Sequence, residues 1–104
     1  MQDLKVSLIQ ADQFWEDITA NLDKFESFIT PLSESDLIVL PEMFHTSFSM
    51  NASLAEEWSE NPVIEQLKLW ATNHQIAIYT SLMVRENEHF FNRGVFVEPS
   101  GKVS

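Results

Sequence analysis

The fold of this chain is decided by the stretch Asp36-Leu37-Ile38-Val39-Leu40-Pro41-Glu42-Met43-Phe44. A short apolar run bounded by an acid and a proline is typical of a buried strand. Pro41 has no backbone donor and fixes the direction in which the chain leaves the strand. Glu42 is therefore predicted to lie at the end of a core strand, beside a low-dielectric interior.

The composition sets the class of protein. The chain has 104 residues, 44% of them hydrophobic, which is enough for one compact core and too little for two domains. Sixteen acidic residues against six basic ones give a net charge of -10. Nucleic-acid binding depends on Lys and Arg neutralising phosphates, so we expect no nucleic-acid partner. An anionic membrane surface would repel the chain for the same reason.

The chain contains no cysteine. Disulfides, thiolate metal sites and a thiol nucleophile are thus excluded within these residues. The start of the chain lacks a basic segment followed by an apolar run, and no apolar run approaches the length of a membrane span. We expect a cytoplasmic globular protein.

The first part of the chain reads as strand, helix, strand. A strand is expected near residues 4–10, and a helix from about Ile18 to Thr30 with Asp17 as its N-cap. The strand at residues 36–40 follows, so these elements form a βαβ unit with parallel strands.

The second part continues with a long connection, a helix and two strands. Residues 43–59 are predicted as a loop with a short helical piece at 52–58. Asn61-Pro62 marks the start of a second helix. Strands are expected at 76–84 and 89–98, antiparallel because residues 85–88 form a short polar turn, and residues 99–101 form a further turn. The order β-α-β-α-β-β indicates an α/β sheet with helices on its faces.

Glu42 is the main candidate for chemistry. Ligand sites in open α/β sheets form at the carboxyl ends of parallel strands, where Glu42 is placed. Apolar walls disfavour a charged carboxylate, which makes it a better base. The residues alone leave a second interpretation open, in which Glu42 is structural and caps or salt-bridges a loop. His45 lies three residues further on, but two ligands do not make a metal site, so we expect no metal and no cofactor.

The segment from Leu37 to Phe44 resembles the first signature of the nitrilase (carbon–nitrogen hydrolase) superfamily. Other segments agree with that family in order and spacing: Gln10-Ala11, Asn21, Leu69-Trp70-Ala71, Phe91-Asn92-Arg93 and Pro99-Ser100-Gly101-Lys102. The resemblance covers essentially the whole chain. It is closest to the amidase branch that acts on ω-amides of dicarboxylic acid monoamides.

The resemblance implies a mechanism with Glu, Lys and Cys. Glu42 matches the glutamate that takes the thiol proton as general base, since a free thiol is mostly protonated at neutral pH. The cysteine then forms a thioester, and the lysine stabilises the oxyanion. We expect the catalytic lysine and cysteine to lie beyond Ser104, with Lys102 a solvated turn residue. Residues 1–104 would then be the N-terminal part of a longer carbon–nitrogen hydrolase domain, inactive alone.

The resemblance also suggests a substrate-binding residue. The family often has glycine and then an aromatic residue at this distance after the glutamate, and the aromatic lines the substrate pocket. Ser47-Phe48 stands there in this chain. Phe48 is thus a candidate for substrate binding or for ordinary core packing. Serine in place of glycine tolerates a positive φ poorly.

The resemblance further implies a four-layer α-β-β-α sandwich, of which this chain is the N-terminal part. It implies a small-molecule amide or nitrile substrate and a homodimer or higher homo-oligomer. The competing hypothesis is a non-catalytic α/β binding or assembly module, in which Glu42 is structural.

Overall fold

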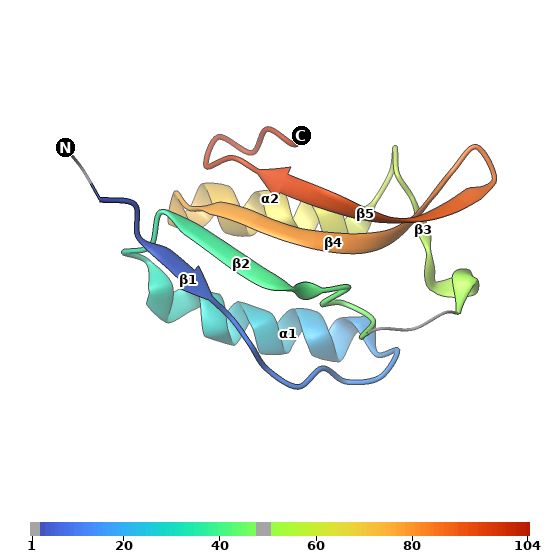
Figure 1. The fold of residues 1–104 in the computed structure, drawn as a ribbon, viewed down its shortest axis with the longest axis horizontal. Helices are drawn as coiled ribbons and strands as arrows, with labels where there is room; N and C mark the ends of the chain where they lie inside the picture. The colour runs from blue at the N-terminus through green and yellow to red at the C-terminus, as the bar shows by residue number, and fades with distance from the viewer. Residues whose placement is uncertain (1–2, 48–50) are drawn as a thin grey trace.

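The computed structural model describes residues 3–47 and 51–104. These residues form a five-stranded sheet and two α-helices (Figure 1). The strands are β1 (Val6–Leu8), β2 (Leu37–Glu42), β3 (Glu56–Glu57), β4 (Ala77–Glu86) and β5 (His89–Val97). The helices are α1 (Ile18–Ile29) and α2 (Pro62–His74), with short 3-10 turns at Thr30–Leu32 and Ala52–Leu54.

The sheet combines parallel and antiparallel pairing. β1, β2 and β4 are parallel neighbours, and β5 runs antiparallel along the other edge of β4. The predicted order β-α-β-α-β-β is therefore confirmed, with one correction. The helical piece expected at 52–58 ends at Leu54, and Glu56–Glu57 instead form β3, parallel to the far end of β4. Pairing with that exposed strand edge outweighs the local helical preference.

Both helices begin where the sequence predicts. The Asp17 carboxylate accepts a hydrogen bond from the Ala20 amide at 3.0 Å. The Asn61 side chain accepts from Val63 and Ile64 at 3.0 and 3.1 Å. Such caps satisfy amides that have no partner within the helix. Among the described residues, no helix is long and apolar enough to cross a membrane.

The β4–β5 hairpin closes through a two-residue turn. Asn87 and Glu88 both have positive φ, 52° and 65°. Two such residues give a turn whose twist matches that of the flanking strands. The hairpin fixes the register over nine residue pairs, from Ile78 with Val97 to Glu86 with His89. A residue on β5 is thus placed opposite a defined residue on β4.

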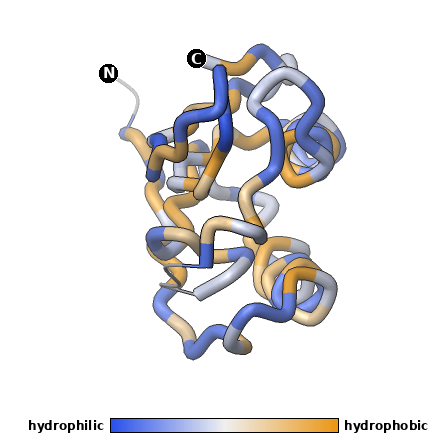
Figure 2. Tube along the Cα trace, turned by 90° about the vertical axis from the view of Figure 1, so that its right-hand side faces the viewer, coloured by the Kyte–Doolittle hydropathy of each residue, from blue (hydrophilic) through white to orange (hydrophobic). Residues whose placement is uncertain are grey.

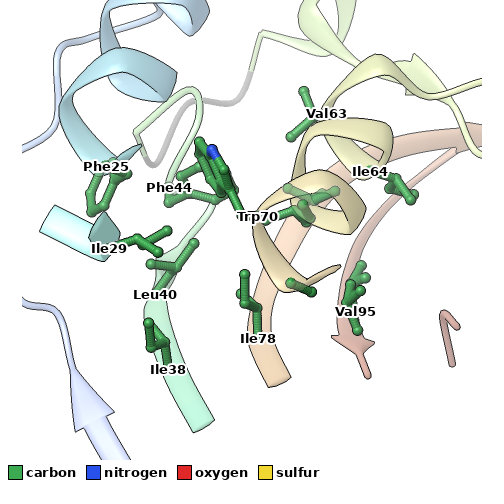
Figure 3. Packing of buried hydrophobic residues seen from close by; sticks show 14 of the residues in the cluster. Phe25, Ile29, Ile38, Leu40, Phe44, Val63, Ile64, Trp70, Ile78 and Val95 are labelled. Carbon is green, nitrogen blue, oxygen red and sulfur yellow. The ribbon is translucent and has the colours of Figure 1, made fainter. Parts of the chain in front are cut away.

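The core lies between the helices and one face of the sheet, since both helices pack on the same side (Figure 2). Phe44, two residues after the end of β2, is fully buried in it. Its ring lies edge-on to Phe25 of α1, with centroids 5.4 Å apart, and 6.1 Å from Trp70 of α2 (Figure 3). Phe44 therefore joins both helices to the end of β2.

The opposite face of the sheet carries apolar side chains that the described residues do not cover. Leu8, Val39, Tyr79 and Phe96 stand in one row across four strands. Leu8 is 75% exposed and Tyr79 is 44% exposed. This open face is where a four-layer sandwich would place its second sheet.

We expect Phe44→Ala to lower the free energy of unfolding by about 3–5 kcal/mol, because it leaves a cavity among the core rings. Phe28→Ala on α1 is the matched control. Phe28 is 38% exposed, so its loss should cost about 1 kcal/mol. Urea unfolding of the full-length protein measures both. Equal losses would contradict the central place of Phe44 in the core.

Candidate active site

A bulge in β2 sets the direction of Glu42. Val39 pairs with Tyr79 of β4 and Glu42 pairs with Ser81, so β2 advances three residues where β4 advances two. Ile38 and Leu40 are buried against the helices. An unbroken alternation would send Glu42 to the same side. The extra residue, at Pro41, instead turns Glu42 to the open face, which is a known effect of bulges.

Glu42 and Asn92 meet on the open face. Asn92 Nδ2 donates a hydrogen bond to Glu42 Oε1 at 2.5 Å. Asn92 belongs to β5, and the two residues are 50 positions apart in the chain. Their contact thus depends on the register of three strands.

Hydrogen bonds hold the backbone on both sides of Glu42. Thr80 Oγ1 donates to the Pro41 carbonyl at 3.0 Å. The Met43 amide donates to the Ser81 carbonyl at 3.1 Å. Gln13 Nε2, from the loop after β1, donates to the Met43 carbonyl at 2.9 Å. The carboxylate is therefore carried on a backbone segment fixed from two sides.

Glu42 lines a shallow hollow of about 270 Å³ on the open face. The other lining residues are Leu40, Tyr79, Thr80, Ser81, Asn92 and Gly94. None of these is cationic. Of the residues that the structure describes, none forms an ion pair with Glu42. No positive charge in the hollow neutralises the Glu42 carboxylate, so its surroundings suit a base better than a partner in a structural ion pair.

The sequence-based expectation for the surroundings of Glu42 was wrong in one respect. Glu42 was placed beside a low-dielectric interior, but its side chain is exposed among the described residues. The bulge is the physical reason, because it turns the carboxylate away from the helix-covered core. The position at the carboxyl end of a central parallel strand is confirmed.

His45 lies inside the protein rather than in the hollow that Glu42 lines. It is 1% exposed, and its ring lies 5.8 Å from that of Phe44. Burial lowers the pKa of His45 from 6.5 to about 4, because a charged imidazole would lose its hydration. Nδ1 has no hydrogen-bond partner among the described residues. The described residues also contain no cluster of potential metal ligands that would include Glu42 and His45.

Asn21 ties the loop after Glu42 to the loop after β1. It is fully buried. Its Nδ2 donates to the His45 carbonyl at 2.9 Å and to the Phe14 carbonyl at 2.7 Å. Its Oδ1 accepts from the Phe14 amide at 2.7 Å. A helix residue thus positions two loops that have no secondary structure of their own.

Phe48, the candidate substrate-binding residue, lies outside the described residues. Its neighbour Ser47 is described and has a φ of 63°. The position is therefore left-handed, the backbone that glycine adopts without strain and serine does not.

Lys102 is not among the residues that line the hollow at Glu42. It is exposed beside the turn at Gly101, whose φ is 91°. It lines a separate hollow with Glu65, Lys68 and Thr72 of α2. The expectation that Lys102 is a solvated turn residue is confirmed.

Sequence reasoning did not identify Asn92 and Asn21 as parts of the site. Asn92 was noted only within a family motif. A polar residue inside a strand that is otherwise rich in aromatic and β-branched residues is a usable signal. Its partner could not be found that way, because the partner depends on the bulge and on the strand register.

Comparison with known proteins places these features in a family. The model of the family described as "Carbon-nitrogen hydrolase" matches residues 5–104. The protein "Omega-amidase YafV" of Yersinia enterocolitica is 35% identical over 99% of this chain, and the Escherichia coli K12 protein of that name is 33% identical. The chain spans 40% of the length of each.

A solved structure agrees in fold. XC1258 from Xanthomonas campestris, a CN-hydrolase superfamily protein with an arsenic adduct in its active site, superposes with a TM-score of 0.94. It is 33% identical, and the match covers all of this chain and 40% of that one. The fold expected from the resemblance is confirmed.

The low pKa of His45 makes stability depend on pH. The unfolded chain takes up a proton near pH 6.5, and the folded chain does so only near pH 4. Stability from neutral His45 is thus fully present above pH 6.5 and is lost as the pH falls to about 4. Glutamine cannot take up this proton. We therefore expect the free energy of unfolding of His45→Gln to fall by up to about 3 kcal/mol less, over this pH range, than that of the unchanged protein. Urea unfolding at about pH 7 and about pH 4.5 measures it, and identical pH dependence in both proteins would contradict it.

Proposed function

This chain belongs to the carbon–nitrogen hydrolase family, and we propose that it supplies Glu42 as the general base of an ω-amidase. The observation that carries the proposal is the placement of Glu42. A bulge turns it to the open face of the sheet, where its carboxylate accepts a hydrogen bond from Asn92 in a hollow without cations. The similarity to two ω-amidases supports the substrate class.

The proposed reaction begins at a cysteine thiol. This chain contains no cysteine, and no lysine lines the hollow at Glu42, so in this proposal the rest of the full-length protein supplies both the thiol and the oxyanion-stabilising lysine. Glu42 accepts the thiol proton, and the sulfur attacks the amide carbon. The C–N bond breaks, Glu42 returns the proton to the departing amine, and ammonia leaves behind a thioester.

The second half of the reaction uses Glu42 again. Water attacks the thioester carbon while Glu42 accepts one of its protons, the C–S bond breaks, and the proton returns to the sulfur. The product is a carboxylate. A lysine cation would stabilise both tetrahedral oxyanions.

The proposed substrate is the ω-amide of a dicarboxylic acid monoamide. Such a molecule carries a carboxylate at the end away from the reacting amide. The residues that line the described hollow include no cation to bind it, so that binding group would come from elsewhere in the protein. Phe48 stays a proposed pocket residue.

We also propose that the full-length protein associates as a homodimer through its helices. Leu69 of α2 is 54% exposed. Large exposed apolar residues on helix faces are suited to contacts between subunits.

We expect Glu42→Gln in the full-length protein to lower kcat for a simple ω-amide by about 10²–10⁴-fold, since glutamine cannot accept the thiol proton. The fold should be unchanged, because glutamine keeps the shape of the side chain. Glu65→Gln, at an exposed position of α2, is the matched control and should keep full activity. Ammonia release measures turnover. Retained activity in Glu42→Gln would remove Glu42 from the mechanism and favour a structural role.

A further inference from the structure

We propose that Asn92 is a positioning residue that holds the Glu42 carboxylate in the orientation needed for proton transfer. The inference rests on the proposed function of Glu42. It assigns a role to a residue that sequence reasoning did not place in the site. The direct observation is the hydrogen bond from Asn92 Nδ2 to Glu42 Oε1.

The contact spans β4, which lies between β2 and β5. Strands in a sheet are about 4.8 Å apart, so the backbones of β2 and β5 are separated by about 10 Å. The side chains of Glu42 and Asn92 can meet over β4 only if little stands between them. Ser81 of β4 pairs with Glu42 on one side and with Gly94 of β5 on the other. The small serine and the missing side chain of Gly94 thus place no bulky group of their own between Glu42 and Asn92.

Tyr79 shows how closely this space is used. A Cβ at position 94 would lie 2.6 Å from the Tyr79 hydroxyl oxygen, well inside contact distance. The absence of a side chain at Gly94 thus admits the tyrosine hydroxyl at the border of the hollow that Glu42 and Asn92 line. The absence of a side chain at Gly94 therefore has a packing reason, because the Tyr79 hydroxyl occupies that space.

The strand that carries Asn92 is fixed on its other face. Arg93, the next residue, points the opposite way because side chains alternate along a strand. Its Nη2 donates to Glu86 Oε1 at 3.0 Å, and its guanidinium lies 4.6 Å from the centre of the Trp58 ring. These contacts resist rotation of β5 at this point, so Asn92 is presented to the open face in a defined orientation.

The chemistry of an amide suits this position. A primary amide donates a hydrogen bond but does not give up its proton at neutral pH. Asn92 therefore occupies Oε1 without protonating it and leaves Oε2 to accept the proton of the thiol. It adds no charge, whereas an arginine there would neutralise the base.

Strand stability does not explain this residue. Asparagine is disfavoured inside strands, where β-branched and aromatic residues are preferred. At position 92 an apolar side chain would pair with Met83 opposite at no cost to the sheet. Asparagine therefore stands at this position against the local preference of a strand, which fits a role through Glu42 and not a role in holding the strand.

Three variants of the full-length protein test the proposal in an ω-amide hydrolysis assay. Asn92→Leu keeps the number and branching of the side-chain heavy atoms but has no donor; we expect kcat to fall about 10- to 100-fold while KM stays within about threefold, the size of effect that misplacing a catalytic group produces. Asn92→Asp keeps the shape, removes the donor and adds a like charge, so its kcat should fall at least as far. Asn92→Gln keeps the amide donor and should therefore keep much of the kcat that Asn92→Leu loses.

Controls separate this proposal from its premise. Asn73→Leu, at an exposed position of α2, should leave kcat unchanged, and thermal unfolding checks that each variant is folded. If Asn92→Leu does not fold, the kcat values of Asn92→Asp and Asn92→Gln decide, because the proposal requires the Gln variant to be the more active of the two. Unchanged kcat in Asn92→Leu, or a raised KM at constant kcat, would overturn the positioning role while Glu42→Gln remains inactive. Retained turnover in Glu42→Gln would instead overturn the proposed function itself.

Discussion

The site depends on one constraint within β2. Alternate side chains of the strand must point into the core, whereas the side chain of its last residue, Glu42, must point to the opposite face of the sheet. Ile38 and Leu40 are buried against the helices, and Phe44 returns to the core just after the strand. Glu42 lies between them and cannot be buried in the same apolar layer without a large loss of hydration energy. The extra residue at Pro41 resolves this conflict, because it reverses the side to which Glu42 points. The proline cannot donate to the sheet, so it is placed where regular pairing is interrupted.

Burial of Phe44 then fixes the position of the chain that follows the bulge. A bulge alone would let the strand end move. Phe44 inserts between Phe25 and Trp70, and so clamps the chain two residues after Glu42 to both helices. Hydrogen bonds from Gln13 and Asn21 fix the same loop from the other side. Core packing and buried polar contacts thus act together on a short segment, and the rigid result is what a catalytic carboxylate requires.

Much of this arrangement could be predicted from the sequence, and the exceptions share one cause. The helix starts at Asp17 and Asn61 and the hairpin after β4 follow from local chemistry, and the structure has them all. The strand at Glu56–Glu57 and the exposure of Glu42 were not predicted. Both depend on which residues of β4 lie opposite, and residue type alone does not fix register. The contact with Asn92 was missed for the same reason, since it joins residues across three strands.

The geometry also limits how the proposed reaction could be completed. The helix-covered face of the sheet is filled by the core, including Leu40 and Thr80 beside Glu42. The backbone around Glu42 is bonded to β4 and to the loop after β1. With respect to the described residues, the open face is therefore the side from which substrate, thiol and lysine would reach the carboxylate in the proposed reaction. Its exposed apolar row at Leu8 and Tyr79 makes that same face favourable for packing another layer of protein. A layer that covers this face would also exclude water around Glu42 and strengthen its hydrogen bond with Asn92. Completing the fold and completing the active site would then be one event, with a single surface serving both.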